Sequence, residues 1–437
     1  MKNTFKTLDE IKEYCSDEGV NIGFSGNTEI YKKSHEINGF KVDNSLAVLP
    51  MEGADALEDG SPGGLTRRRY LSFVRGGAGI IWFEAVAVVP EGRASMRQLH
   101  LHKDNVDAFR RLTDEVKEAA LKQNGHAPML VIQLTHSGRY SKPDGVSRPV
   151  IAAHNPVLDE KYGIAPDYPV VTDEALEALE DKFADTARLA QAAGFDAVDV
   201  KASHGYLLGE LLGAHTREGR YGGGYAGRTR FIKNAAEKVK QAVDARITLA
   251  SRLSLYDAME PQYGFGAGPD GQPDLTEPVR LLRELYDIGV KLCAVTVGNP
   301  YLIPHVNRPY DNGPYVPPEP PVKGVERLLT LAAEAKAGVP EMAFIGAGYS
   351  WLKGFAVQAG AYALEIGHAD FIGFGRQAFA NPGFANDILE TGEIAPGKTC
   401  ITCTRCVELM RSMLPAGCVV RDKMYARLYQ QKIKNNA

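Results

Sequence analysis

Eight short apolar runs alternate with helix-like segments up to residue 384, and this alternation constrains the fold more than any other feature. The runs are rich in Val, Ile and Phe and are almost continuously apolar. Such runs are typical of strands buried on both faces, as in a parallel sheet. They cover residues 44–49, 79–84, 128–134, 195–201, 247–252, 291–297, 342–346 and 370–374.

The segments between these runs carry helical signals, most clearly at residues 172–193. Thr172 is a suitable N-cap, Asp173 and Glu174 place negative charge in the first turn, and Gly194 provides a C-terminal cap. Eight strands alternating with helices predict a TIM (β/α)8 barrel, an α/β fold, with a doubly wound sheet as the rival. Similar helical patterns occupy residues 105–122, 227–243, 277–286, 325–337 and 352–365.

Charge and hydropathy exclude several classes of protein. The 437 residues include 50 Lys and Arg against 54 Asp and Glu, a net charge of −4, which excludes a strongly basic nucleic-acid-binding protein. No apolar run approaches the roughly 18 residues that a membrane-spanning helix needs. The first 15 residues lack the apolar core of a signal peptide. We therefore expect a cytoplasmic protein without nucleic-acid or membrane partners.

A cysteine-rich tail, residues 385–437, follows the predicted barrel domain, residues 1–384. Three cysteines separated by two residues each are followed, after eleven intervening residues, by a fourth. A short loop of this kind can bring thiolates around one soft metal centre, and the run of three favours a [4Fe-4S] cluster over structural zinc. Disulfides are the weakest alternative, because they are rare in the cytoplasm. Cys15 and Cys293 are expected to be ordinary thiols. The predicted ligands are Cys400, Cys403, Cys406 and Cys418.

Two glycine-rich loops follow the last two predicted strands. Gly346 and Gly348 end the seventh strand, and Gly375 and Arg376 end the eighth. These loops are where a TIM barrel binds phosphate, through exposed backbone N–H groups and a cationic side chain. The one G-x-G-x-x-G pattern, residues 222–227, does not follow an apolar strand. The sequence therefore predicts a phosphate-bearing cofactor but no dinucleotide-binding unit.

These segments resemble the old yellow enzyme family of FMN-dependent oxidoreductases. The branch they resemble most is the iron–sulfur branch typified by 2,4-dienoyl-CoA reductase and trimethylamine dehydrogenase. The resemblance implies FMN and a [4Fe-4S] cluster held by the four tail cysteines. The matching segments are residues 49–51, 81–88, 91–93, 131–139, 199–212, 220–223, 228–231 and 251–254. The implied flavin-binding residues are Pro50, Met51, Ala85, Gln133, Arg252, Gly348, Gly375 and Arg376.

The resemblance also implies a reaction, hydride transfer from FMN to the C=C bond of an enone, enoate or enoyl thioester. Lys201 and His204 would stabilise negative charge on the substrate carbonyl oxygen, and Tyr206 would be the general acid. Two alternatives remain. One is an amine dehydrogenase of the trimethylamine dehydrogenase type, and the other is a flavin and iron–sulfur electron-transfer subunit.

The chain departs from the family pattern in three places. Lys201 stands where His is frequent, which points to a carboxylate-bearing substrate, and Glu52 replaces the Thr or Cys that many members carry near the flavin. The chain ends 19 residues after Cys418, so we expect no FAD- or NAD(P)-binding domain. Electrons would then come from a partner such as ferredoxin or a flavoprotein, or directly from NAD(P)H. We also expect the loop at residues 299–310 to shape the substrate pocket.

Overall fold

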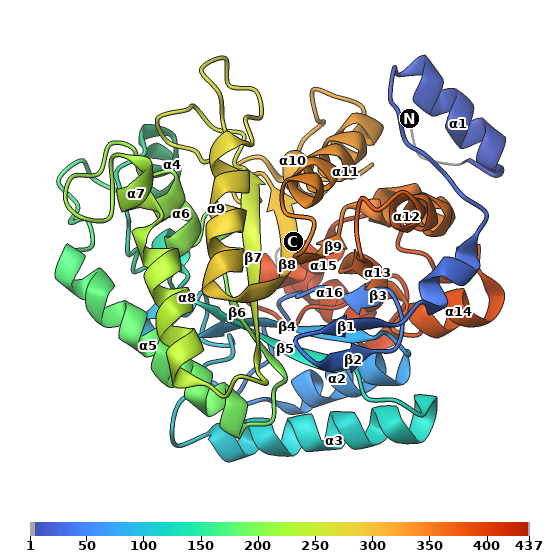
Figure 1. Ribbon diagram of the computed structural model, residues 1–437, viewed down its shortest axis with the longest axis horizontal. Coiled ribbons are helices and arrows are strands. Elements are labelled where there is room, and N and C mark those ends of the chain that lie inside the picture. The colour runs from blue at the N-terminus through green and yellow to red at the C-terminus, as the bar shows by residue number, and fades with distance from the viewer. Residues whose placement is uncertain (1–4, 436–437) are drawn as a thin grey trace.

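The structure is a computed structural model that describes residues 5–435, and its centre is a closed barrel of eight parallel strands (Figure 1). The order around the barrel is β10-β3-β4-β5-β6-β7-β8-β9, and Phe374 on the last strand pairs with Val48 on the first. Closure confirms the TIM barrel and excludes the doubly wound sheet. The strands are β3 (Leu46–Val48), β4 (Ile80–Ala87), β5 (Met129–Thr135), β6 (Ala197–Val200), β7 (Thr248–Tyr256), β8 (Val290–Val297), β9 (Ala343–Gly346) and β10 (Phe371–Phe374).

Helices surround the barrel, one for each strand. In α5, Thr172 caps the first turn by accepting a hydrogen bond from the Ala175 N–H at 3.2 Å, and Leu176 and Phe183 are buried against the barrel. This confirms the helix predicted at residues 172–193. The ring comprises α2 (Gly64–Arg75), α3 (Val106–Asn124), α5 (Asp173–Ala192), α8 (Arg230–Ala242), α9 (Thr276–Ile288), α11 (Pro321–Gly338), α12 (Ala356–Glu365) and α14 (Phe384–Thr391).

Shorter elements fill the connections, and two of them divide helices that the sequence predicts as continuous. Lys353 has a left-handed φ of 56°, which kinks η4 (Tyr349–Phe355), and the α-helix within the segment predicted at residues 352–365 begins only at Ala356. The segment at 227–243 is likewise divided into α7 and α8. The remaining elements are α1 (Leu8–Asp17), η1 (Thr28–Lys32), β1 (His35–Ile37), β2 (Phe40–Val42), η2 (Pro90–Gly92), η3 (Gly138–Tyr140), α4 (Pro156–Tyr162), α6 (Leu207–Leu212), α7 (Tyr225–Arg228), α10 (Pro304–Asn307), α13 (Arg376–Ala380), η5 (Pro396–Lys398), α15 (Arg405–Arg411) and α16 (Lys423–Asn435).

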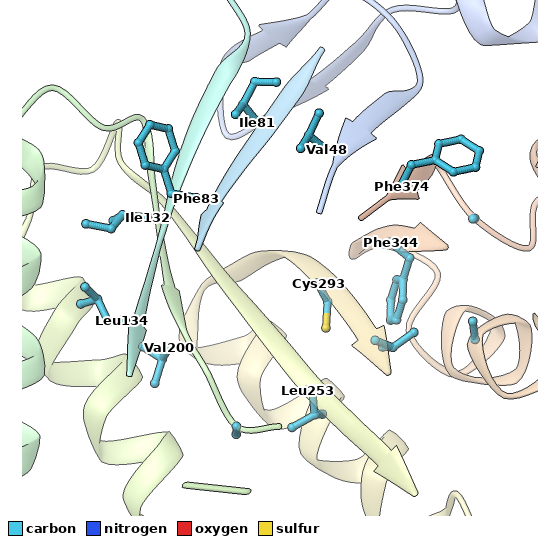
Figure 2. Close-up of a cluster of buried hydrophobic side chains, with 14 of the residues drawn as sticks. Val48, Ile81, Phe83, Ile132, Leu134, Val200, Leu253, Cys293, Phe344 and Phe374 are labelled. Atoms are coloured by element: carbon cyan, nitrogen blue, oxygen red, sulfur yellow. The ribbon is translucent and has the colours of Figure 1, made fainter. Parts of the chain in front are cut away.

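The core has two layers because successive strand residues point to opposite faces. On β4, Ile80 and Trp82 belong to the cluster inside the barrel, whereas Ile81 and Phe83 belong to the cluster between strands and helices. Figure 2 shows this outer layer, which includes Cys293 as a small buried side chain. Full burial of such side chains stabilises the fold by roughly 1.5–3 kcal/mol each. Two buried faces explain why the strands are continuously apolar in sequence.

The tail packs against the loops at the carboxyl ends of the strands. The Ala416 N–H donates to the carbonyl of Gly53, which follows β3, at 2.7 Å. The Arg411 guanidinium donates to the carbonyl of Pro300, which follows β8, at 2.8 Å. Residue 384, the predicted end of the barrel domain, is the first residue of α14, a helix of the ring. Among residues 5–435, no helix combines the length and apolarity that crossing a membrane requires.

Candidate active site

One cleft, with an empty volume of about 1230 Å³, lies at the carboxyl ends of the barrel strands. This is the face on which TIM barrels carry their active sites. All eleven residues predicted to bind flavin or to act in catalysis line it. They are Pro50, Met51, Ala85, Gln133, Lys201, His204, Tyr206, Arg252, Gly348, Gly375 and Arg376.

A buried carboxylate, Asp199 on β6, orders the floor of the cleft. It accepts hydrogen bonds from Trp82 Nε1 at 2.9 Å, from Gln133 Nε2 at 2.7 Å and from the Arg252 backbone N–H at 2.8 Å. Burial raises the pKa of Asp199 to about 6, although these donors oppose the shift. The bonds fix the orientation of the Gln133 amide and the position of Arg252 on the strand.

Arg252 and His204 present buried nitrogens that have no hydrogen-bond partner within residues 5–435. They are Arg252 Nε and His204 Nε2. Burial lowers the pKa of Arg252 to about 10. Burial and the cations Arg252 and Lys201 hold the pKa of His204 well below its ordinary value, so its imidazole is neutral near pH 7. Unsatisfied buried polar atoms are rare and costly, and two of them facing one cleft indicate a bound group that forms hydrogen bonds with them.

The two glycine loops form a cradle that side chains would fill. Gly348 has a φ of +101°, and a Cβ there would lie 2.8 Å from the Leu328 side chain. A Cβ at Gly375 would lie 2.9 Å from the Met51 sulfur. Beside the cradle, Arg376 Nη1 is also buried without a partner among the described residues. Backbone N–H groups that glycine leaves accessible, beside a guanidinium nitrogen without a partner among the described residues, suit a phosphate. The cleft therefore fits FMN, whose ring would contact Gln133 and Arg252.

A carboxylate, two phenols and an ammonium lie close together near the carboxyl end of β6. The Tyr206 hydroxyl donates to Glu52 Oε1 at 3.0 Å and lies 3.1 Å from the Tyr301 hydroxyl. Lys201 Nζ lies 3.7 Å from the centre of the Tyr206 ring. Burial lowers the pKa of Lys201 to about 8, opposed by Glu52, and burial raises the pKa of Glu52, opposed by Lys201. Tyr301 belongs to the loop at residues 299–310 that was expected to shape the pocket, and it lines the cleft.

The four tail cysteines line a second, smaller cavity that shares part of its wall with the cleft. Arg376, Phe379 and Cys406 border both. Gln377 on α13 holds the loop in place, because its Oε1 accepts from the Cys400 N–H at 2.7 Å. All four sulfurs are free thiols, so the disulfide alternative is wrong. Within residues 5–435, no three His, Cys, Asp or Glu side chains converge closely enough to bind one metal ion.

Several polar residues of the matching segment 131–139 and of the loop at 299–310 lie outside the cleft. Arg139 is fully buried and pairs with Asp159 and Glu210, and His136 accepts a hydrogen bond from the Gly138 N–H at 3.0 Å. His305 bonds the Tyr315 hydroxyl at 2.6 Å. These side chains have structural partners of their own.

The loop at 299–310 and the tail complete the wall of the cleft. The loop contributes Pro300, Tyr301, Asn307 and Arg308, and the tail contributes Cys406, Val407, Met410, Arg411 and Ala416. The tail residues carry no motif beyond the cysteine. Their part in the wall depends on where the tail docks, which a linear pattern does not reveal.

Comparison with known proteins identifies the family. Residues 35–392 match the NADH:flavin oxidoreductase / NADH oxidase family. An NADPH dehydrogenase from Geobacillus sp. (strain WCH70) is 31% identical over 227 residues, covering 51% of this chain and 63% of that protein. An NADH oxidase from Thermoanaerobacter brockii is 27% identical over 373 residues, covering 84% of this chain and 52% of that protein. The chain thus spans between about half and two thirds of the length of these relatives.

A solved structure agrees with this at the level of the fold. A 2-naphthoyl-CoA reductase, in complex with 2-naphthoyl-CoA, superposes with a TM-score of 0.73 at 18% identity, covering 92% of this chain and 58% of that one. The family match covers the barrel, and its description agrees with the flavin chemistry that the cleft fits. The chain therefore belongs to the NADH:flavin oxidoreductase / NADH oxidase family.

Proposed function

We propose that the protein is an FMN-dependent ene-reductase that reduces the C=C bond of an α,β-unsaturated carbonyl compound carrying an acidic group. One observation carries the proposal: Lys201, His204 and Tyr206 line the same cleft as the residues that fit FMN. When bound, FMN supplies the hydride that such a reduction needs. The side chains of this chain supply positioning, charge stabilisation and a proton.

We propose that Lys201 and His204 bind the carbonyl oxygen of the substrate. Both face the cleft from the loop after β6, and His204 has a free Nε2 within the described part of the chain. Negative charge develops on that oxygen as the double bond is reduced, and donors fixed in a buried site stabilise it without reorganisation. Tyr206, which is only 3% exposed, would deliver the proton to the α carbon.

The charge of the cleft supports an acidic substrate. Its lining contains one carboxylate, Glu52, against five cationic side chains. Such a lining attracts anions and repels a substituted ammonium, which argues against an amine dehydrogenase. Enoates and enoyl thioesters of coenzyme A carry the charge that fits. The cations are Lys201, Arg252, Arg308, Arg376 and Arg411.

The tail cavity supports an iron–sulfur cluster held by Cys400, Cys403, Cys406 and Cys418. The four thiols surround a shared cavity, which suits a cluster of several atoms better than a single zinc ion. When bound, the cluster supplies one-electron transfer. Because Cys406 also borders the flavin cleft, we propose that a partner such as ferredoxin or a flavoprotein donates electrons through this tail. Direct reduction by NAD(P)H is the alternative route.

A comparison of substrates tests the proposed reaction. Protein reconstituted with FMN is reduced anaerobically and mixed with crotonate, crotonyl-CoA or 2-cyclohexen-1-one, and oxidised protein is mixed with trimethylamine. The proposal expects flavin reoxidation by the alkenes, fastest for the acidic ones, and no flavin reduction by the amine. Reduction by the amine together with inert alkenes would overturn it.

A further inference from the structure

The hydrogen bond between Tyr206 and Glu52 determines where the phenol hydrogen points. A tyrosine hydroxyl has one hydrogen, and an ionised carboxylate only accepts hydrogen bonds. While Glu52 is ionised, the Tyr206 hydrogen is therefore directed at Oε1, across the 3.0 Å contact. Tyr301 then donates to the Tyr206 oxygen, across 3.1 Å. In this state Tyr206 has no hydrogen to give to a substrate.

Protonation of Glu52 reverses that hydrogen bond. The carboxylic acid then donates to the Tyr206 oxygen, and the phenol hydrogen is free to turn toward the cleft. We propose that Glu52 stores the proton that Tyr206 passes to the substrate, so that the pair acts as a two-residue relay. The inference rests on the proposed ene-reductase reaction and assigns a role to a carboxylate that this reaction does not otherwise use.

The relay balances its protons and electrons. The Tyr206 O–H bond breaks as the proton bonds to the α carbon, and the Glu52 O–H bond breaks as its proton bonds to the phenol oxygen. When bound, reduced FMN would supply the two electrons as a hydride to the β carbon and would itself be left oxidised. The products are a saturated carbonyl compound, neutral Tyr206 and ionised Glu52. Solvent reprotonates Glu52 before the next turnover.

The surroundings of Glu52 suit both of its charge states. Burial raises the pKa of the carboxyl, while the Lys201 ammonium, the Tyr206 bond and the more distant Arg69 lower it. Without the relay, Tyr206 would have to become a phenolate, and burial together with Glu52 holds its pKa well above 10. Passing the charge on to Glu52, beside Lys201, avoids that phenolate. The charged or titratable groups facing Glu52 are Lys201, Arg69, Glu84, Tyr206 and Tyr301.

Glu52→Gln tests the relay, because glutamine retains the shape and hydrogen bonding but stores no proton. Reduced FMN-loaded protein is mixed with crotonyl-CoA in a single turnover at a series of pH values. In the native protein the reduction rate should fall as pH rises through the pKa of Glu52. The Glu52→Gln variant should reduce crotonyl-CoA about 100-fold more slowly at low pH, a typical loss for removal of a proton donor. Its pH profile should also lack the limb, the fall in rate as pH rises through the pKa of Glu52. A second limb, from Lys201, should remain in both proteins, near pH 8 in the native protein and at a lower pH in Glu52→Gln, because the Glu52 carboxylate raises the pKa of Lys201.

Two further variants separate a proton relay from a structural contact. Adding Glu52→Gln to Tyr206→Phe should cause no further loss, since residues that act as one unit are not additive. Tyr301→Phe removes the other hydrogen bond of Tyr206 and is the matched control, which should keep the limb. An unchanged pH profile in Glu52→Gln, or additive losses, would overturn the relay.

A spectroscopic measurement tests the relay without any substrate. With 3-fluorotyrosine at position 206 of the FMN-loaded protein, the ¹⁹F resonance should shift with pH as the hydrogen bond reverses. The same shift should be absent in Glu52→Gln, and its persistence there would contradict the relay. If the native protein transfers no hydride to crotonyl-CoA, the proposed reaction fails instead. The two failures are thus distinguishable.

Discussion

The ammonium of Lys201 lies 3.7 Å from the centre of the Tyr206 ring, so a cation contacts the proposed proton donor near the carboxyl end of β6. A cation in contact with a ring face is held there electrostatically. Lys201 is nearly fully buried, and this contact fixes an otherwise flexible side chain in the wall of the cleft. The first prediction follows from this placement.

Replacing Lys201 should alter the use of acidic substrates in a pH-dependent way. Its pKa is lowered to about 8, mainly by burial, so the cation is present below pH 8 and lost above it. For crotonate, kcat/KM should fall as pH rises through 8, and Lys201→Gln should abolish that limb. 2-Cyclohexen-1-one, which carries no charge, should respond less. Equal losses of kcat/KM for crotonate and 2-cyclohexen-1-one would show that Lys201 does not recognise the charge of the substrate.

Arg252 should contribute to FMN affinity. Its Nη1 donates to the Pro50 carbonyl at 3.2 Å, and its buried Nε has no partner within residues 5–435. A hydrogen bond to a charged group contributes about 1.5–3 kcal/mol. Arg252→Met should therefore weaken FMN binding by roughly 10- to 100-fold, measured by fluorescence quenching of free FMN. Unchanged affinity would remove Arg252 from the flavin site.

Gly348 should be needed for the cofactor and not only for its backbone conformation. Both Gly348 and Gly367 have positive φ, +101° and +73°, but a Cβ at Gly367 would meet no atom within 4 Å. Alanine at either position should cost about 1–3 kcal/mol of stability from strain. Only Gly348→Ala should also lose FMN, when both variants are compared by melting and by flavin content. Equal flavin content in the two variants would contradict the phosphate cradle.

Cys406 should be required for iron and Cys15 should not. Cys406 lines the thiol cavity, whereas Cys15 lies buried on α1. After anaerobic reconstitution, Cys406→Ser should lose most of its iron and sulfide, and Cys15→Ser should retain both. Zinc bound in place of iron in the native protein would contradict the cluster.

The strands were predictable because burial on both faces favours apolar residues at successive positions of the sequence. Residues 292–295, within the run 291–297, are apolar at successive positions because one residue faces the barrel interior and the next faces the helices. The break at Lys353 was not predictable, since its left-handed φ follows from tertiary packing and not from local propensity.

The cleft was predictable only in part. The family resemblance of their segments grouped Gln133 and Arg252, and residues at the carboxyl ends of barrel strands must converge, which agrees with that grouping. The hydrogen bond between Glu52 and Tyr206 joins residues 154 positions apart. Its geometry depends on two loops, which no periodic pattern describes.

The most direct test of the central claim is a stoichiometric anaerobic turnover. The protein is reconstituted with FMN, reduced by one equivalent of dithionite and mixed with one equivalent of crotonyl-CoA. We predict full return of the oxidised flavin band and one equivalent of butyryl-CoA per FMN. A flavin that stays reduced while crotonyl-CoA remains unchanged would contradict an ene-reductase.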